Sequence, residues 1–131
     1  MDTNQSPKTP LEGTKLANYN PVTPVTELQI IDTVIGTGDE VPQGATITAH
    51  YTGALAVDGT IFQSSHDFGD TVTFGLHQVI SGWTQGVPGM KVGGTRRLVI
   101  PAALAYGASS PSANIPPNSD LVFDIELAKL N

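Results

Sequence analysis

The fold is decided by the stretch Leu121-Val122-Phe123-Asp124-Ile125-Glu126-Leu127 near the end of the chain. Successive side chains of a β-strand point to opposite faces of a sheet. Every second residue from Leu121 to Leu127 therefore shares one apolar face, whereas Asp124 and Glu126 lie on the other. This alternation is typical of an antiparallel strand with one face on the core and one in water.

A second alternating stretch, residues 47–52, places Ile47, Ala49 and Tyr51 on one face of a strand. Asp58-Gly59, between residues 54–56 and 60–62, predicts a tight hairpin because both turn residues tolerate positive φ. Weaker strand candidates cover residues 28–35, 72–74 and 95–100.

One segment has a helical pattern, in which Val79, Trp83, Val87 and Met90 recur at spacings of four and three, with Ser81 available as the N-cap. Its glycines and proline limit the helix to about two turns. The sequence therefore predicts an α+β domain in which a five- to six-stranded antiparallel sheet wraps around one short α-helix.

Residues 1–25 differ from the rest, because prolines are scattered among Thr, Asn, Ser and Lys with few apolar anchors. Leu11, Leu16 and Tyr19 could dock part of this segment, but the composition favours a flexible tail or tether ahead of a domain over residues 26–131. Such a tail is typical of an exported or tethered protein, so we expect an extracytoplasmic rather than a cytoplasmic location. No apolar signal segment follows Met1, and the absence of cysteine leaves the compartment open.

The composition excludes several functions. With 131 residues the chain fits one domain, and its net charge of −6 argues against a nucleic-acid surface. The only basic doublet, Arg96-Arg97, is interpreted as a solvated strand end. Residues 64–67 (Ser-Ser-His-Asp) contain the residue types of a hydrolase triad, but sequence neighbours rarely converge on one reacting atom. The three histidines lack metal-ligand spacing and are expected in surface or turn positions. We therefore expect no metal and no cofactor.

The aromatic residues lie beside glycine and proline turns, and two of them suggest a cavity. Trp83 is the only tryptophan and stands at the start of the predicted helix, where its large apolar face could form a cavity floor. Tyr106 begins a loop rich in serine and proline, where a phenol could donate to a bound carbonyl.

These residues occur in motifs that resemble the FKBP family of peptidyl-prolyl cis/trans isomerases over about residues 26–130. The matching motifs are His50-Tyr51-Thr52-Gly53, Asp58-Gly59, Phe62 with Ser64-Ser65, residues 78–83 (Gln-Val-Ile-Ser-Gly-Trp), residues 86–93, Ala105-Tyr106-Gly107, and Ile115-Pro116-Pro117 leading into Leu121-Val122-Phe123-Asp124. The resemblance implies rotation of X-Pro bonds in peptides and folding proteins, without a covalent intermediate.

The resemblance also implies a site. Its catalytic positions correspond to Tyr51, Phe62, Trp83, Tyr106 and Phe123, and its substrate-binding positions to Gln63, Val79, Ile80 and Ile115. Trp83 would lie under the proline ring, while the Ile80 backbone N–H and the Tyr106 hydroxyl would meet ligand carbonyls. The implied partners are proline-containing peptides, unfolded proteins and macrolides such as FK506 or rapamycin, and we expect a monomer.

Three departures from the family pattern leave an alternative open. Gln63 stands where the family usually carries an acid, a second wall aromatic is replaced near Val72, and the stretch from Phe74 to Trp83 is short. Gln63 can still accept a hydrogen bond, so activity is expected to persist, whereas affinity for macrolides is in doubt. The alternative is a binding module that uses the pocket or the loop 107–120 with little catalysis.

Overall fold

One antiparallel sheet organises the chain in the computed structural model, which describes residues 10–22 and 24–131. The strands are β1 (Gln29–Val34), β2 (Thr46–Leu55), β3 (Ile61–Ser64), β4 (Val72–Gly75), β5 (Thr95–Ile100) and β6 (Leu121–Leu130). The helical elements among the described residues are α1 (Ser81–Gly86) and the short 3-10 helices η2 (Ser65–Asp67) and η3 (Ala102–Leu104). The predicted α+β architecture is confirmed.

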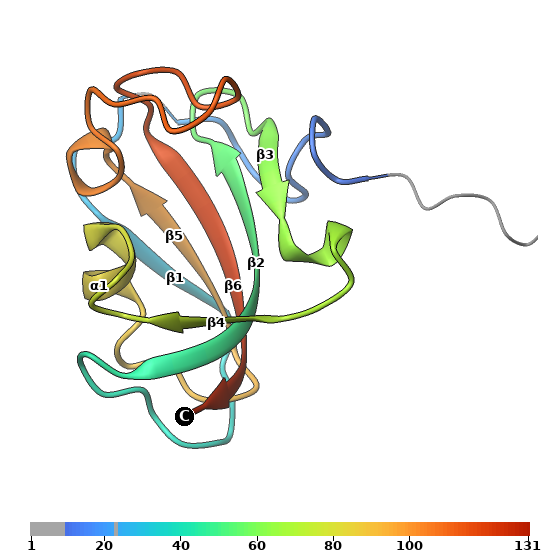
Figure 1. Cartoon of the computed structure of the whole chain (residues 1–131), viewed down its shortest axis with the longest axis vertical. Helices are drawn as coiled ribbons and strands as arrows, with labels where there is room; N and C mark the ends of the chain where they lie inside the picture. Colours follow the sequence, from blue (N-terminus) through green and yellow to red (C-terminus); the bar gives the residue numbers. More distant parts are fainter. Residues whose placement is uncertain (1–9, 23) are drawn as a thin grey trace, which may run out of the picture.

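The sheet order is β1-β5-β6-β2-β3, and β4 also pairs with β2. Strand β4 pairs with the first half of β2, from Thr46 to Ala49, while β3 pairs with the second half, from Thr52 to Ala54. Figure 1 shows the long strands β2 and β6 side by side, with α1 to one side of them. Alternate residues of these two long strands therefore lie on the face of the sheet that α1 helps to cover.

The alternation that defines β6 is confirmed. Leu121, Phe123, Ile125 and Leu127 are buried in the core that α1 covers, while Asp124 and Glu126 are half-buried on the opposite face. Val122 is also buried, because that opposite face carries a second, smaller apolar cluster. The sheet is thus only partly wet on its outer face.

Helix α1 approaches the sheet closely because its buried positions include glycines. A Cβ added to Gly82 would lie 2.6 Å from side-chain atoms of Ile100, and one added to Gly86 would lie 2.7 Å from Leu98. The predicted N-cap is wrong: Ile80, with extended φ and ψ of −60° and 150°, precedes the helix, and Ser81 is its first residue. No helix among the described residues has the length and apolarity needed to cross a membrane.

The hairpin predicted at Asp58-Gly59 joins β2 to β3, with a five-residue connection (residues 56–60) rather than a tight one. Gly59 has a φ of +77° and donates its N–H to the Leu55 carbonyl. Asp58 does not adopt positive φ; its carboxylate instead accepts the Thr60 N–H at 2.9 Å. The glycine thus supplies the unusual backbone conformation, and the aspartate supplies an acceptor.

An N-terminal arm, defined as residues 10–22, 24 and 25, packs on the outer face of the sheet (Figure 1, blue). Leu16 and Val25 are buried there, and Tyr19 donates its hydroxyl hydrogen to the Ala56 carbonyl. The arm also pairs with the outer edge of β3, where the Gly13 N–H donates to the Ile61 carbonyl at 2.8 Å. These residues are docked rather than loose, while residues 1–9 of the expected tail lie outside the described residues. The boundary near residue 25 stays a prediction.

The interpretation of Arg96-Arg97 as a solvated strand end is wrong. Adjacent residues of β5 point to opposite faces of the sheet, so the two guanidinium groups contact different parts of the protein. Arg96 is buried, pairs with Asp32 at 2.7 Å and donates to the Gly86 and Pro88 carbonyls at the end of α1. Arg97 pairs with Asp124 at 2.6 Å and donates to two carbonyls of the N-terminal arm. Arg96 therefore binds the end of α1 to the sheet, and Arg97 binds the N-terminal arm to it.

Candidate active site

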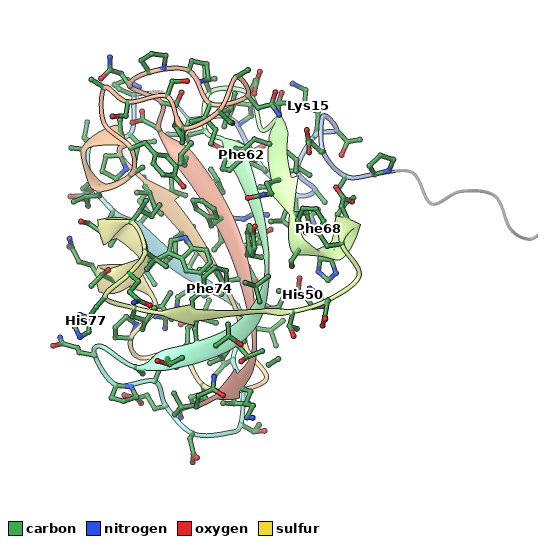
Figure 2. All side chains as sticks on the ribbon, viewed as in Figure 1. Lys15, His50, Phe62, Phe68, Phe74 and His77 are labelled. Atoms are coloured by element: carbon green, nitrogen blue, oxygen red, sulfur yellow. The ribbon has the colours of Figure 1, made fainter. Side chains whose placement is uncertain are left out.

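A cavity of about 470 Å³ opens on the α1 side of the sheet. It lies where α1, the middle of β2, the start of β6, strands β3 and β4 and the loop after η3 meet. Figure 2 labels two of its walls, Phe62 on β3 and Phe74 on β4. The residues that line the cavity are Tyr51, Phe62, Gln63, Phe74, Gln78, Val79, Ile80, Trp83, Tyr106 and Phe123.

Trp83 is the centre of the aromatic cluster around this cavity. Its ring makes edge-to-face contacts with Phe74, Phe123 and Tyr51, at centroid distances of 4.9, 5.3 and 5.9 Å. Phe62 packs edge-to-face on Phe123 at 5.7 Å. Because each aromatic ring packs against its neighbour, these contacts hold the walls of the cavity in place without a ligand.

Strand register and one small residue place the walls. Gly53 of β2 lies directly opposite Phe123 of β6. A Cβ at Gly53 would be 2.6 Å from the Phe62 ring and 2.7 Å from the Phe123 ring. The absence of a side chain at this position therefore lets the two phenylalanine rings pack over the strand.

Few polar groups face this cavity. Burial raises the pKa of the Tyr51 phenol above its usual range, and the neighbouring Tyr106 raises it further, so the Tyr51 hydroxyl stays protonated near neutral pH. The buried Trp83 Nε1 has no hydrogen-bond partner among the described residues. For the Ile80 N–H, likewise, no acceptor is found in that part of the chain. A ligand carbonyl at the N-terminal end of α1 could therefore accept a hydrogen bond from the Ile80 N–H.

The structure brings together eight of the nine site residues that the sequence analysis named. Ile115 is the exception: it is buried in the core beside the cavity and does not line it. Two lining residues were missed, Phe74 and Gln78. Val72, where the resemblance indicated a lost wall aromatic, does not line the cavity, whereas Phe74 does. The two-residue period of β4 was the available signal for Phe74.

The side chains of residues 64–67 bond to other groups and not to one another, so they form no triad. Ser64 contacts Thr52, Ser65 accepts the Tyr51 N–H, and Asp67 accepts two N–H groups of the N-terminal arm. His66 binds Glu126 at 2.7 Å and stacks on His50 at 4.0 Å. The expectation of surface or turn positions therefore holds for the exposed His77 but is wrong for His50, which is a half-buried strand residue.

Comparison of the sequence with known proteins points to one enzyme family. Residues 38–128 match the family FKBP-type peptidyl-prolyl cis-trans isomerase. The chain is 50% identical over 86 residues to "Peptidyl-prolyl cis-trans isomerase FPR2" of Saccharomyces cerevisiae, which covers 64% of either chain. It is 47% identical over 105 residues to an "FK506-binding protein" of Neisseria meningitidis serogroup B, which covers 79% of this chain and 95% of the relative.

A solved structure extends the match to three dimensions. The crystal structure of a peptidyl-prolyl cis-trans isomerase from Pseudomonas syringae pv. tomato superposes with a TM-score of 0.71 at 36% identity, covering 79% of this chain and 75% of the other. Fold, cavity and sequence agree. The chain therefore belongs to the family of FKBP-type peptidyl-prolyl cis-trans isomerases.

Proposed function

We propose that the cavity around Trp83 is the site where this enzyme rotates X-Pro bonds, with the proline ring lying on the indole. The observation that carries the proposal is an aromatic cavity with a tryptophan at its centre and, at its edge, the Ile80 backbone N–H, which has no acceptor among the described residues. Tyr51, Phe62 and Phe123 would enclose the ring. The Ile80 N–H and the Tyr106 hydroxyl would hold the carbonyls of the bound chain.

The physical mechanism needs no nucleophile. Amide resonance sets a barrier of roughly 18–20 kcal/mol to rotation of the X-Pro bond. The twisted amide loses that resonance and its carbonyl is less polarised, so water stabilises the planar ground state more than the twisted state. An apolar cavity removes this advantage of the planar state. Each ~1.4 kcal/mol of preferential binding to the twisted state then gives a tenfold acceleration.

The partners of the cavity are part of the proposal. Proline-containing peptides and unfolded proteins are the substrates that its size and apolar walls support. FK506-like macrolides would compete for the same walls, with an affinity that depends on Gln63, because a carboxamide replaces the acid usual in the family. We also propose that the protein acts as a monomer. We further propose an extracytoplasmic location, which the composition of the N-terminal segment favours.

The test is the cis-to-trans relaxation of a short Leu-Pro peptide at about 10 °C, where the uncatalysed step takes minutes. The intact chain is expected to accelerate it, and Trp83→Leu is expected to remove most of the acceleration. Because Trp83 is the only tryptophan, its fluorescence reports ligand binding directly in the unmodified protein. Acceleration that FK506 abolishes would support both catalysis and macrolide binding in this cavity.

Two other outcomes would change the proposal. A peptide that alters Trp83 fluorescence without faster relaxation would indicate a binding module and overturn the proposed role of the cavity in catalysis. Acceleration that persists in Trp83→Leu, with the variant shown to be folded by circular dichroism, would move the chemistry away from this cavity.

A further inference from the structure

The Ile80 N–H belongs to the segment 76–80, which runs from the end of β4 to the start of α1 (Figure 1). Gln78, Val79 and Ile80 of this segment line the cavity. The segment is neither strand nor helix, and two of its N–H groups, those of Leu76 and Gln78, find backbone acceptors among the described residues. Its place at the cavity edge therefore depends on contacts other than regular backbone pairing.

Thr84 of α1 supplies such a contact. Its hydroxyl donates to the Leu76 carbonyl at 2.6 Å, and its N–H donates to the Ile80 carbonyl at 3.2 Å. These carbonyls belong to the first and last residues of the segment, so Thr84 holds both of its ends. Leu76 is fully buried, and no other donor to its carbonyl occurs in the described part of the chain. The hydroxyl therefore satisfies an acceptor that water does not reach.

The Thr84 hydroxyl bonds to this distant carbonyl rather than within its own helix. A threonine inside a helix often bonds to the carbonyl four residues earlier. Here that carbonyl, of Ile80, lies 3.5 Å from the Thr84 Oγ1, whereas the Leu76 carbonyl lies 2.6 Å from it. The shorter bond thus ties α1 to the end of β4, across the segment that carries the Ile80 N–H.

We infer that Thr84 is a positioning residue, whose hydroxyl holds the Ile80 N–H at the cavity edge where a substrate carbonyl would accept it. The inference rests on the proposed function of the cavity. Without the hydroxyl, the Leu76 carbonyl would be buried without a donor, and the segment would shift to relieve that penalty. Because hydrogen bonds weaken steeply with poor distance or angle, a displaced N–H would bind the carbonyl less tightly.

The experiment removes the hydroxyl and the N–H separately and together. Thr84→Val keeps the shape of the side chain and the backbone bond to Ile80, and it removes the hydroxyl. Ile80→Pro removes the N–H; proline suits this position because Ile80 has a φ of −60° and its N–H has no acceptor among the described residues. Peptide Kd from Trp83 fluorescence and kcat/KM for a short Leu-Pro peptide are measured for the wild type, both single variants and the double variant.

Thr84→Val is expected to raise Kd and lower kcat/KM by about two- to tenfold, the range that one neutral hydrogen bond gives. Thr84→Ser keeps a hydroxyl and should stay within about twofold of the wild type. In the Ile80→Pro background, which has no N–H to position, Thr84→Val should change both quantities by less than about twofold. A merely structural role predicts lower stability of Thr84→Val, with Kd and kcat/KM unchanged while the variant is folded.

Two matched controls accompany these variants. Thr73→Val removes a hydroxyl from an exposed position of β4 and should leave Kd and kcat/KM at the wild-type values. Ile80→Val changes the same lining side chain as Ile80→Pro but keeps the N–H, so Thr84→Val should retain its full effect in that background. If circular dichroism shows that Thr84→Val does not fold, Thr84→Ala, which also lacks the hydroxyl, takes its place with the same expected changes.

The outcomes separate this inference from the proposed function. A wild type that accelerates the peptide, with Kd and kcat/KM unchanged in folded Thr84→Val, overturns the role of Thr84 and leaves the proposed function intact. A loss that persists at full size in the Ile80→Pro background overturns that role as well, because Thr84 would then not act through the N–H. If the wild type binds the peptide without accelerating it, the proposed function fails and the Kd values alone decide the role of Thr84. If it neither binds nor accelerates the peptide, both are overturned.

Discussion

Gly82 of α1 lies so close to Ile100 of β5 that a Cβ on the glycine would be 2.6 Å from both Cδ1 and Cγ2 of the isoleucine. This contact sets the distance between the helix and the sheet. Since Trp83 is the next residue along α1, the same contact fixes the height of the cavity floor. A methyl group at position 82 would have to displace either the helix or the fully buried Ile100.

We therefore expect Gly82→Ala to lower the free energy of unfolding by about 1–3 kcal/mol through overpacking. This loss outweighs the gain of about 1 kcal/mol that alanine brings to a helix interior. Urea denaturation measures it, with Gln85→Ala, an exposed position on the same helix, as the control expected within about 0.5 kcal/mol of wild type. Adding Ile100→Val should recover part of the loss. Equal stability of Gly82→Ala and wild type would show that the helix can move freely from the sheet.

Removal of the Tyr106 hydroxyl tests its proposed contact with substrate. Tyr106 is 37% exposed and lines the cavity. Tyr106→Phe keeps the ring and removes one donor, a loss of about 0.5–1.5 kcal/mol or roughly two- to tenfold in kcat/KM. The matched control is Tyr19→Phe in the N-terminal arm, whose hydroxyl bonds to the Ala56 carbonyl and not to the cavity. An equal change in both variants would argue against a contact between Tyr106 and the substrate.

The sequence predicted best where a single local rule decides the structure. The two-residue period of residues 121–127 predicted β6 because core and solvent lie on opposite faces there. Asp58-Gly59 predicted the β2–β3 hairpin because Gly59 needs positive φ. The family motifs brought eight of nine site residues to one cavity, because the motifs that contain those eight fall on elements that border it.

The prediction failed where long-range packing overrides local pattern. The composition of the N-terminal segment favoured a flexible tail, although Leu16 was recognised as a residue that could dock; Leu16 and Val25 are in fact buried on the outer face of the sheet. Arginine is usually a surface residue, yet Arg96 is buried because Asp32 and two carbonyls at the end of α1 satisfy its guanidinium. Phe74 was missed because its place in the cavity depends on how β4 crosses β2.

The N-terminal arm should contribute to stability and not to catalysis. Leu16 is 9% exposed and packs in the cluster that includes Val25, Val99 and Val122, on the face of the sheet opposite the cavity. Leu16→Ala is expected to lower the free energy of unfolding by about 2–3 kcal/mol. kcat/KM for a short Leu-Pro peptide should stay at the wild-type value while the variant is folded. Val57→Ala, at a position 55% exposed, is the control and should change stability by less than about 0.5 kcal/mol. A loss of activity in folded Leu16→Ala would show that the arm also positions the cavity.

The half-buried phenol of Tyr51 predicts how stability depends on alkaline pH. Burial raises the folded-state pKa of this group above its usual value of about 10, so the folded protein holds the proton more tightly than the unfolded chain. The stability from this difference is fully present below about pH 10 and is lost as the pH rises through the folded-state pKa. Tyr51→Phe cannot ionise, so its free energy of unfolding should fall less than that of the wild type between about pH 9 and 11.

Urea denaturation at several pH values measures this difference in slope. Phe74→Leu is the control, because it changes the same cavity without an ionisable group, and its loss of stability should be the same at each pH. Since desolvation of the half-buried phenol is the main cause of the raised pKa, the slope difference also reports how well water is excluded from this wall. Parallel curves for the wild type and Tyr51→Phe would mean that the Tyr51 hydroxyl is hydrated in the folded protein, and the apolar environment that the proposed mechanism requires would then be absent at this wall.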